Sequence, residues 1–192
     1  MSYSVLIIGL GQIGMDYDYD QDTKSQDIVL THAQAVSTHL NFELLGGVDT
    51  RIEQREKFSQ KFKRPTYESV SDALSVCDYD VVVISVSTDW HLELCKTVLS
   101  QAKPKLILLE KPLAYSSKDS LAIIELSQAK GVPIAINYFR FLDFSWYTCG
   151  CIVNGVGGCA EEALDQRESN LVGALFVRLL VLELGRSKRQ KS

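Results

Sequence analysis

Three glycines stand at a spacing that can serve a phosphate-bearing ligand. Gly9, Gly11 and Gly14 follow directly on the apolar residues 5–8, so the chain reads G-x-G-x-x-G after a short hydrophobic run. The first glycine permits a tight turn, the second lets the backbone approach a pyrophosphate, and the third lets a helix lie close to a strand. The free N–H groups at the start of such a helix favour anions. The spacing predicts a dinucleotide-binding turn.

An acidic residue, Asp49, follows the second apolar segment, residues 42–48. A carboxylate at the tip of that strand can accept hydrogen bonds from both hydroxyls of an adenosine ribose and repels a 2′-phosphate, which favours NAD over NADP. Thr50 and Glu53 predict a capping box for the next helix and so leave Asp49 available for a ligand. Arg51 argues the other way, because its guanidinium can pair with a 2′-phosphate, and NADP stays open.

Polar and charged residues also follow the later apolar segments. They are Ser87 and His91 after residues 80–85, Glu110 and Lys111 after residues 106–109, and Asn137 after residues 133–136. Loops at the carboxyl ends of parallel strands line the ligand crevice of an open α/β sheet. A lysine in such a crevice can orient a substrate alcohol and stabilise negative charge as the proton leaves. We therefore expect these side chains and the glycine turn to meet along one edge.

The elements that must position these residues alternate along the chain. Residues 80–85 have an unbroken β-branched, apolar centre, as a parallel strand buried on both faces requires. Six apolar segments separated by helical patterns predict an α/β fold, a doubly wound parallel sheet of the Rossmann type. Ser69 with Asp72, and Ser116 with Asp119, predict the starts of two of its helices.

The glycine turn, Asp49, the Ser/Thr loop with His91 and the sequence Glu110-Lys111-Pro112 together resemble the Gfo/Idh/MocA oxidoreductase family. The resemblance covers roughly residues 4–140 and implies the strand order 3-2-1-4-5-6. It implies hydride transfer between a nicotinamide cofactor and a carbohydrate-like hydroxyl or ketone, with Lys111 catalytic and Glu110 holding it in place. The cofactor-binding residues that it implies are Gly9, Gly11, Gln12, Ile13, Gly14, Asp49, Ser87, His91, Glu110 and Asn137.

Residues 15–29 interrupt the first helix with a polar, strongly acidic segment. Their lack of helical periodicity predicts an inserted loop, a solvated flap after which the helix resumes near Ile28. Carboxylates beside a bound pyrophosphate would repel it. The flap must therefore point away, be bridged by a cation, or offer Tyr17 or Tyr19 in place of its charges.

No metal site is expected. Asp16, Asp18 and Asp20 match a calcium-binding loop only in part, because Gln21 stands where the glycine that bends such a loop belongs. The five cysteines form no C-x-x-C pair, and the last three have no histidine near them. This pattern favours free thiols over disulfides or a zinc site.

Composition excludes several other classes of function. The 192 residues carry a formal net charge of −4, which leaves no basic excess to bind nucleic acid. No positively charged segment precedes a signal-like apolar run, and residues 5–8 are too few to span a membrane. We expect a cytoplasmic protein that binds a small-molecule substrate, with neither nucleic acid nor membrane as a partner.

The predicted domains are residues 1–142, which bind the dinucleotide, and an atypical tail of residues 143–192. Members of the family continue into a substrate domain with a catalytic histidine, whereas no histidine follows His91 here. Residues 171–184 are apolar but too short and too charged to span a bilayer, so they predict one helix. A truncated product would explain this tail, as would a helix that covers the sheet or forms a homo-oligomer.

Two alternatives stay open. A catalytically inactive regulator, or a truncated product that only binds NAD(P), is favoured by the missing histidine and the missing substrate domain. A methyltransferase that uses S-adenosylmethionine also has a glycine turn and an acidic second strand, but it gives Glu110-Lys111-Pro112 no role.

Overall fold

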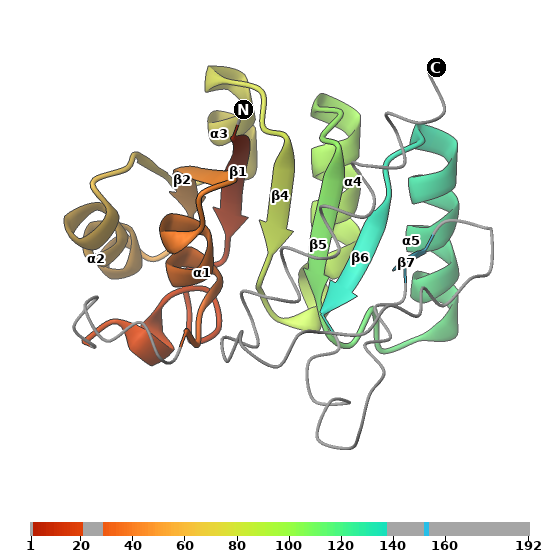
Figure 1. Cartoon of the computed structure of the whole chain (residues 1–192). Helices are drawn as coiled ribbons and strands as arrows, with labels where there is room; N and C mark the ends of the chain where they lie inside the picture. Colours follow the sequence, from red (N-terminus) through yellow and green to blue (C-terminus); the bar gives the residue numbers. More distant parts are fainter. Residues whose placement is uncertain (1, 21–28, 138–151, 154–192) are drawn as a thin grey trace, which may run out of the picture.

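Strands and helices alternate along the chain, as the apolar segments predict (Figure 1). The computed structural model describes residues 2–20, 29–137 and 152–153. The strands are β1 (Tyr3–Ile8), β2 (Phe42–Val48), β3 (Thr66–Tyr67), β4 (Val81–Ile84), β5 (Leu106–Glu110), β6 (Ile134–Asn137) and β7 (Ile152–Val153). The helices are η1 (Asp16–Asp18), α1 (His32–Thr38), α2 (Ile52–Phe62), α3 (Val70–Val76), η2 (Thr88–Trp90), α4 (His91–Gln101) and α5 (Ser117–Lys130), of which η1 and η2 are short 3-10 helices.

The strands form a sheet in the order β3-β2-β1-β4-β5-β6-β7. The first six are parallel to their neighbours, and β7 runs antiparallel to β6. From β1 the chain moves outward to β2 and β3 and then returns to β4 on the other side of β1, so the winding reverses between β1 and β4. This order confirms the doubly wound sheet, whose ligand crevice is expected at the carboxyl ends of those two strands. The predicted tail lies outside the described residues except for β7.

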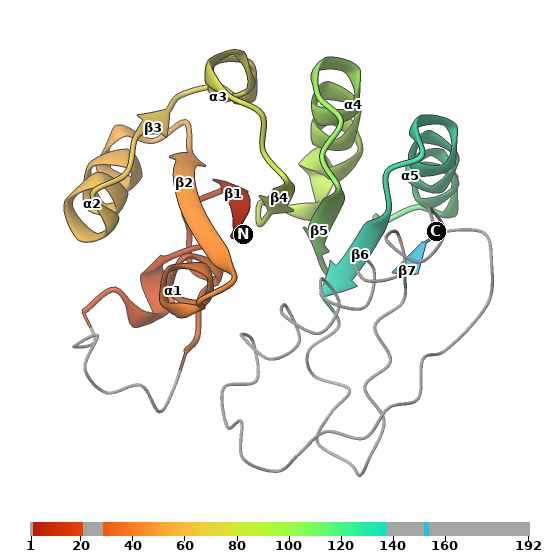
Figure 2. The same cartoon turned by 45° about the horizontal axis from the view of Figure 1, so that its top comes forward.

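Side chains leave the sheet on two faces because successive residues of a strand point to opposite sides. Val5 and Ile7 of β1 pack with residues of α1 and α2, whereas Leu6 and Ile8 pack with residues of α3, α4 and α5. Figure 2 shows α3, α4 and α5 together on one side of the sheet and α1 on the other. Burial on both faces fixes the register of the central strands β1, β4, β5 and β6, and with it the line along which their ends meet.

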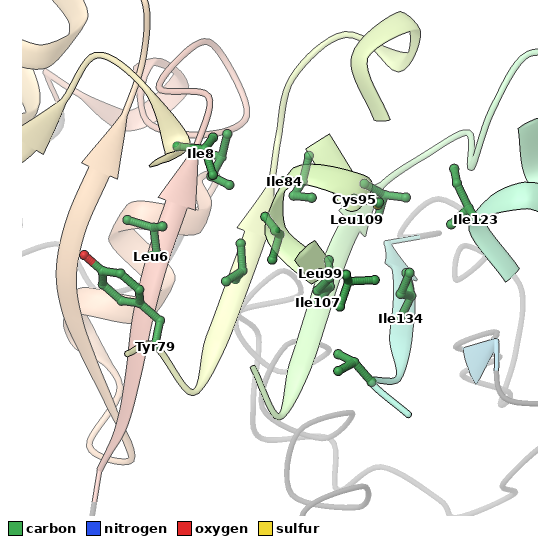
Figure 3. Packing of buried hydrophobic residues seen from close by; sticks show 14 of the residues in the cluster. Leu6, Ile8, Tyr79, Ile84, Cys95, Leu99, Ile107, Leu109, Ile123 and Ile134 are labelled. Carbon is green, nitrogen blue, oxygen red and sulfur yellow. The ribbon is translucent and has the colours of Figure 1, made fainter. Parts of the chain in front are cut away.

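The face that α3, α4 and α5 cover is a continuous apolar layer. Leu6, Ile84 and Ile107 come from three neighbouring strands, and Cys95 and Leu99 of α4 pack in the same cluster (Figure 3). All five are at most 3% exposed. Burying side chains of this size contributes about 1.5–3 kcal/mol each, so this layer holds the strand ends in place.

Two of the predicted helix starts are confirmed, and one is wrong. The hydroxyl oxygen of Ser69 accepts a hydrogen bond from the N–H of Asp72 at 3.1 Å, and Ser116 does the same for Asp119 at 3.0 Å. The capping box predicted at Thr50 does not form: α2 begins at Ile52, after a residue whose side chain makes no cap. None of the described helices is both long and apolar enough to cross a membrane.

The insertion leaves and rejoins the first helix at a defined place. Met15 N–H donates to the carbonyl of Gly11 at 2.8 Å, which closes one helical turn after β1. The first N–H of α1, that of His32, then donates to the carbonyl of Ile13 at 3.1 Å, so α1 stacks on that turn as its continuation. The helix predicted to resume near Ile28 therefore begins at His32.

Candidate functional site

Two of the three glycines are required by packing inside the turn itself. Gly9 has φ +92°, and a Cβ there would lie 2.5 Å from the carbonyl oxygen of Ser85. A Cβ on Gly14 would overlap the carbonyl of Gly9. The hydroxyl of Ser85 donates to that same carbonyl at 2.8 Å. The turn after β1 is thus packed tightly against the end of β4.

Gly11 differs from the other two because nothing inside the described structure explains the missing side chain. A Cβ there would meet only the Nη2 of Arg51, at an ordinary contact distance of 3.5 Å. The space over Gly11 is otherwise open among the described residues. A glycine without an internal packing role fits a position where a ligand approaches the backbone.

Asp49 lies at the end of β2, beside the glycine turn, and is 8% exposed. One of its oxygens accepts from the N–H of Leu10 at 2.9 Å and from Nη2 of Arg51 at 3.1 Å. The other accepts from the N–H and the Nε of Arg51, at 2.9 and 3.0 Å. A carboxylate offers about four acceptor sites, and this one is fully engaged. The prediction that Asp49 is left available by a cap at Thr50 is therefore wrong for this state.

The same contacts set the charge of Asp49. Burial alone would raise the pKa of this carboxyl, but the hydrogen bonds from Arg51 and Leu10 outweigh burial and hold its pKa below the ordinary value. Arg51 itself is half exposed, with 55% of its side chain accessible. A ligand that binds Asp49 can therefore displace an exposed guanidinium without opening the core.

The loop after β4 brings Ser87 to the surface and buries His91. His91 is 0% exposed, with Nδ1 3.2 Å from the carbonyl oxygen of Leu113 and Nε2 3.3 Å from that of Val86. The imidazole thus joins the loop after β4 to the loop after β5. Ser87 is exposed and precedes η2. Of the two residues predicted from this loop, Ser87 presents a hydroxyl to solvent, whereas His91 contacts backbone carbonyls.

Glu110 stands at the carboxyl end of β5, where three other groups surround it. Its Oε1 lies 2.7 Å from Nε2 of His32 and accepts a hydrogen bond from Nδ2 of Asn137 at 2.6 Å. Its Oε2 accepts from the backbone N–H of Lys111 at 3.4 Å. Asn137 is the direct register partner of Glu110 on β6. The structure therefore brings together three predicted residues, Glu110, Lys111 and Asn137.

This cluster is buried, and its charge is compensated from within. Glu110 is 9% and His32 is 1% exposed. Burial alone would raise the pKa of Glu110, but His32, Asn137 and the Lys111 N–H act more strongly and hold the pKa below its ordinary value. Lys111 itself is exposed, and the peptide bond that joins it to Pro112 is cis.

Sequence reasoning missed His32, which it treated only as part of a helix. His32 lies on a short helix whose neighbours Ala33, Ala35 and Val36 are also buried. A histidine in such a short, buried helix is a weak signal, since a buried histidine often has a purely structural role. Its partner is 78 positions away in the sequence, and only the fold brings the two together.

The two halves of the site lie on the same edge of the sheet. β4 separates β1 from β5, so the glycine turn and Glu110 follow strands about 10 Å apart. His32 connects them directly, because its N–H binds the carbonyl of Ile13 in the turn and its ring binds Glu110. Among the described residues, no three His, Cys, Asp or Glu side chains are grouped so as to hold a metal ion.

Comparison with known proteins agrees with this geometry. Residues 3–138 match a sequence model of the Gfo/Idh/MocA group, described as "Oxidoreductase family, NAD-binding Rossmann fold". The myo-inositol dehydrogenase Hyg17 of Streptomyces leeuwenhoekii is 26% identical over 140 residues, which are 73% of this chain and 38% of that protein. The glucose-6-phosphate 3-dehydrogenase of Bacillus subtilis is 25% identical over 128 residues, 66% of this chain and 35% of that protein.

A solved structure is similar to this chain as well. The NAD-binding protein from Listeria innocua superposes with a TM-score of 0.58 and 27% identity, over 74% of this chain and 37% of that one. The present chain thus spans little more than a third of the length of the relatives that it matches. The match covers the glycine turn, Asp49, His32 and the Glu110–Asn137 cluster. The chain belongs to the Gfo/Idh/MocA oxidoreductase family and carries its NAD-binding Rossmann domain.

Proposed function

We propose that the chain binds NAD and takes part in hydride transfer between the nicotinamide and a sugar-like hydroxyl or ketone. The observation that carries the proposal is the placement of Glu110 and Lys111 on the same sheet edge as the glycine turn, connected to it through His32. Both curated relatives bear the names of dehydrogenases of polyhydroxy compounds, inositol and glucose 6-phosphate. The substrate class rests on that similarity.

The glycine turn supplies the phosphate-binding part of this proposal. Open space over Gly11 lets a pyrophosphate approach the backbone, and the N–H groups of Gln12 and Ile13 belong to the turn that follows. Free N–H groups and the dipole of a first helical turn favour an anion. The exposed hydroxyl of Ser87 is proposed to contact the cofactor from the neighbouring loop. His91 and Asn137 are proposed to act by holding their loops in place.

Asp49 and Arg51 decide between the two nicotinamide dinucleotides. In NAD binding, the adenosine ribose hydroxyls take over the carboxylate oxygens that Arg51 now occupies, and the exposed guanidinium swings aside. In NADP binding, Arg51 would pair with the 2′-phosphate, but the buried, ionised Asp49 would repel that phosphate. We therefore propose NAD as the preferred cofactor.

Lys111 is the proposed catalytic residue. Bound NAD supplies the hydride acceptor, and the lysine side chain contributes an ammonium group that can hold a substrate hydroxyl and stabilise its oxygen as the proton leaves. Glu110 fixes the start of this loop, because its carboxylate binds the Lys111 N–H while His32 and Asn137 hold that carboxylate. The exposed Lys111 side chain is free to reach a substrate, and the buried cluster keeps its backbone in place.

The test uses the full chain and separates binding from turnover. Calorimetric titration with NADH measures binding. The change in nicotinamide absorbance with a panel of inositols, sugars and sugar phosphates measures turnover. Lys111→Met should retain NADH affinity and lose turnover by at least a hundredfold, whereas Lys130→Met, at the far end of α5, should retain both. Failure of the wild-type chain to bind NADH would overturn the proposal.

A second candidate function is a nucleotide-binding regulator without catalysis. The chain spans little more than a third of the length of its relatives, and the shared part is the NAD-binding domain, so the similarity supports cofactor binding more directly than turnover. NADH binding without turnover on any member of the panel would favour this candidate over the dehydrogenase.

A further inference from the structure

The insertion after the glycine turn is fastened at its neck by one buried carboxylate. Asp18 is 2% exposed, and one of its oxygens accepts from the backbone N–H groups of Leu30 and Thr31, at 2.9 and 3.0 Å. Its other oxygen accepts from the Thr31 hydroxyl at 2.6 Å. The two ends of the insertion are therefore held together just before α1 begins. The predicted solvated flap is wrong for this part of it.

A second set of contacts joins the insertion to α2. The side-chain amide of Gln54 donates to Asp16, and Nζ of Lys57 lies 3.7 Å from the same carboxylate. Nζ of Lys61 donates to the carbonyls of Asp18 and Tyr19, at 2.7 and 2.9 Å. The carboxylates of Asp16 and Asp18 are thus bound by protein groups, and the repulsion expected between these acids and a pyrophosphate is reduced.

Tyr17 lies between these two aspartates but has different surroundings. Its N–H donates to the carbonyl of Gln12 at 3.0 Å, and its hydroxyl donates to the side-chain oxygen of Gln12 at 3.2 Å. Gln12 directly follows Gly11, the glycine with open space above it. Tyr17 is 53% exposed. A large aromatic side chain with a hydroxyl donor is therefore held at the glycine turn, and its ring faces solvent.

Tyr19, the other tyrosine of the insertion, has different contacts from Tyr17. It packs against the core cluster under α1 and α2, and the cations of Lys57 and Lys61 lie 5.6 and 5.3 Å from its ring. Its hydroxyl donates to the carbonyl of Lys57 at 3.4 Å, on the α2 side. The insertion therefore uses one tyrosine to dock itself and leaves the other at the turn.

We propose that Tyr17 is a dinucleotide-binding residue contributed by the insertion. This inference rests on NAD(P) binding at the glycine turn. On binding, the Tyr17 hydroxyl transfers its hydrogen bond from the oxygen of Gln12 to a pyrophosphate oxygen, and the Gln12 amide can rotate to donate to the phenol oxygen. A bond from a phenol to a phosphate anion is charge-assisted, so it is stronger than the neutral bond that it replaces.

The test compares two tyrosines of the same insertion. Calorimetric titration of the full chain with NADH and with ADP-ribose is carried out for the wild type, Tyr17→Phe and Tyr19→Phe. Tyr17→Phe should weaken both ligands roughly tenfold, because one charge-assisted bond is lost. Tyr19→Phe should bind both as the wild type does. ADP-ribose lacks the nicotinamide but shares the pyrophosphate with NADH. An equal loss of affinity for the two ligands therefore assigns the Tyr17 contact to the part that they share.

Each other outcome has a defined meaning. Equal affinities of wild type and Tyr17→Phe, or an equal loss in Tyr19→Phe, would overturn the inference while NADH binding by the wild type still supported the proposed function. No binding by the wild type would overturn both. Thermal unfolding controls for an effect on stability. The half-exposed ring of Tyr17 is retained in Tyr17→Phe, so the melting temperature should not change.

Discussion

The two ends of the candidate site are built in opposite ways. At the end of β2, Asp49 takes three of its four hydrogen bonds from a residue only two positions away, Arg51, whose side chain is 55% exposed. At the end of β5, Glu110 is held by His32 and Asn137, 78 and 27 positions away, and the whole cluster is buried. The first arrangement can exchange its partner for a ligand. The second is a fixed support, so we expect its loss to affect folding first and ligand binding second.

The largest effect should follow from removing the fixed support. His32→Ala removes a hydrogen bond to the buried Glu110 carboxylate, which costs about 3 kcal/mol of unfolding free energy. Urea unfolding followed by circular dichroism measures the loss. The double variant His32→Ala with Glu110→Gln should recover part of it, because the buried charge is gone. If the double variant is no more stable than His32→Ala alone, the charge is not what His32 compensates.

The next effect comes from two of the glycines in the turn after β1. Gly9→Ala should destabilise the protein by about 2 kcal/mol, because its backbone has φ +92° and the new Cβ would strike the carbonyl of Ser85. Gly11→Ala should stay within about 0.5 kcal/mol of the wild type, but it should weaken NADH binding because the methyl group occupies the open space above the turn. Equal losses of stability in the two variants would show that Gly11 has a packing role that its surroundings do not explain.

Acid unfolding should distinguish the buried cluster from the rest of the protein. The pKa of Glu110 is lower in the folded than in the unfolded chain, so its stabilisation is complete above the unfolded value, about 4.3, and is lost as the pH falls through the folded value. As the pH falls below about 4.3, the wild type should therefore lose stability faster than Glu110→Gln does. Parallel losses in the two proteins, measured by urea unfolding at each pH, would contradict this assignment.

The smallest effect on stability should come from changing the ion pair of Asp49 and Arg51. Arg51→Gln should change the unfolding free energy by less than about 1 kcal/mol, because the guanidinium is largely exposed and Asp49 keeps its hydrogen bonds from the backbone N–H groups of Leu10 and Arg51. It should nevertheless raise the ratio of NADH to NADPH affinity several-fold, since Asp49 loses its competitor and a 2′-phosphate loses its cation. An unchanged ratio would mean that Arg51 does not compete for the ribose site.

Local patterns predicted most of the fold. The spacing of Gly9, Gly11 and Gly14 and the apolar segments predict the α/β sheet, while its strand order was implied by the family resemblance. The caps at Ser69 and Ser116 form as expected. These features depend on residues within a few positions of one another, which is where sequence patterns carry information.

What could not be predicted depends on partners far apart in the sequence. Gln54 binds Asp16 across 38 positions, which no periodicity indicates. His32 looks like an ordinary helix residue until the fold places it against Glu110. In each case a polar side chain finds a partner that only the tertiary structure supplies.

The most direct test of the account is whether bound NADH shields Lys111. Lysines of the full chain are acetylated with limiting acetic anhydride, with and without saturating NADH, and the extent at each position is read by mass spectrometry. We expect NADH to protect Lys111 severalfold and to leave Lys130, at the far end of α5, unchanged. Equal acetylation of Lys111 in the two samples, with NADH binding verified by calorimetry, would contradict the claim that the two halves of this edge form one site.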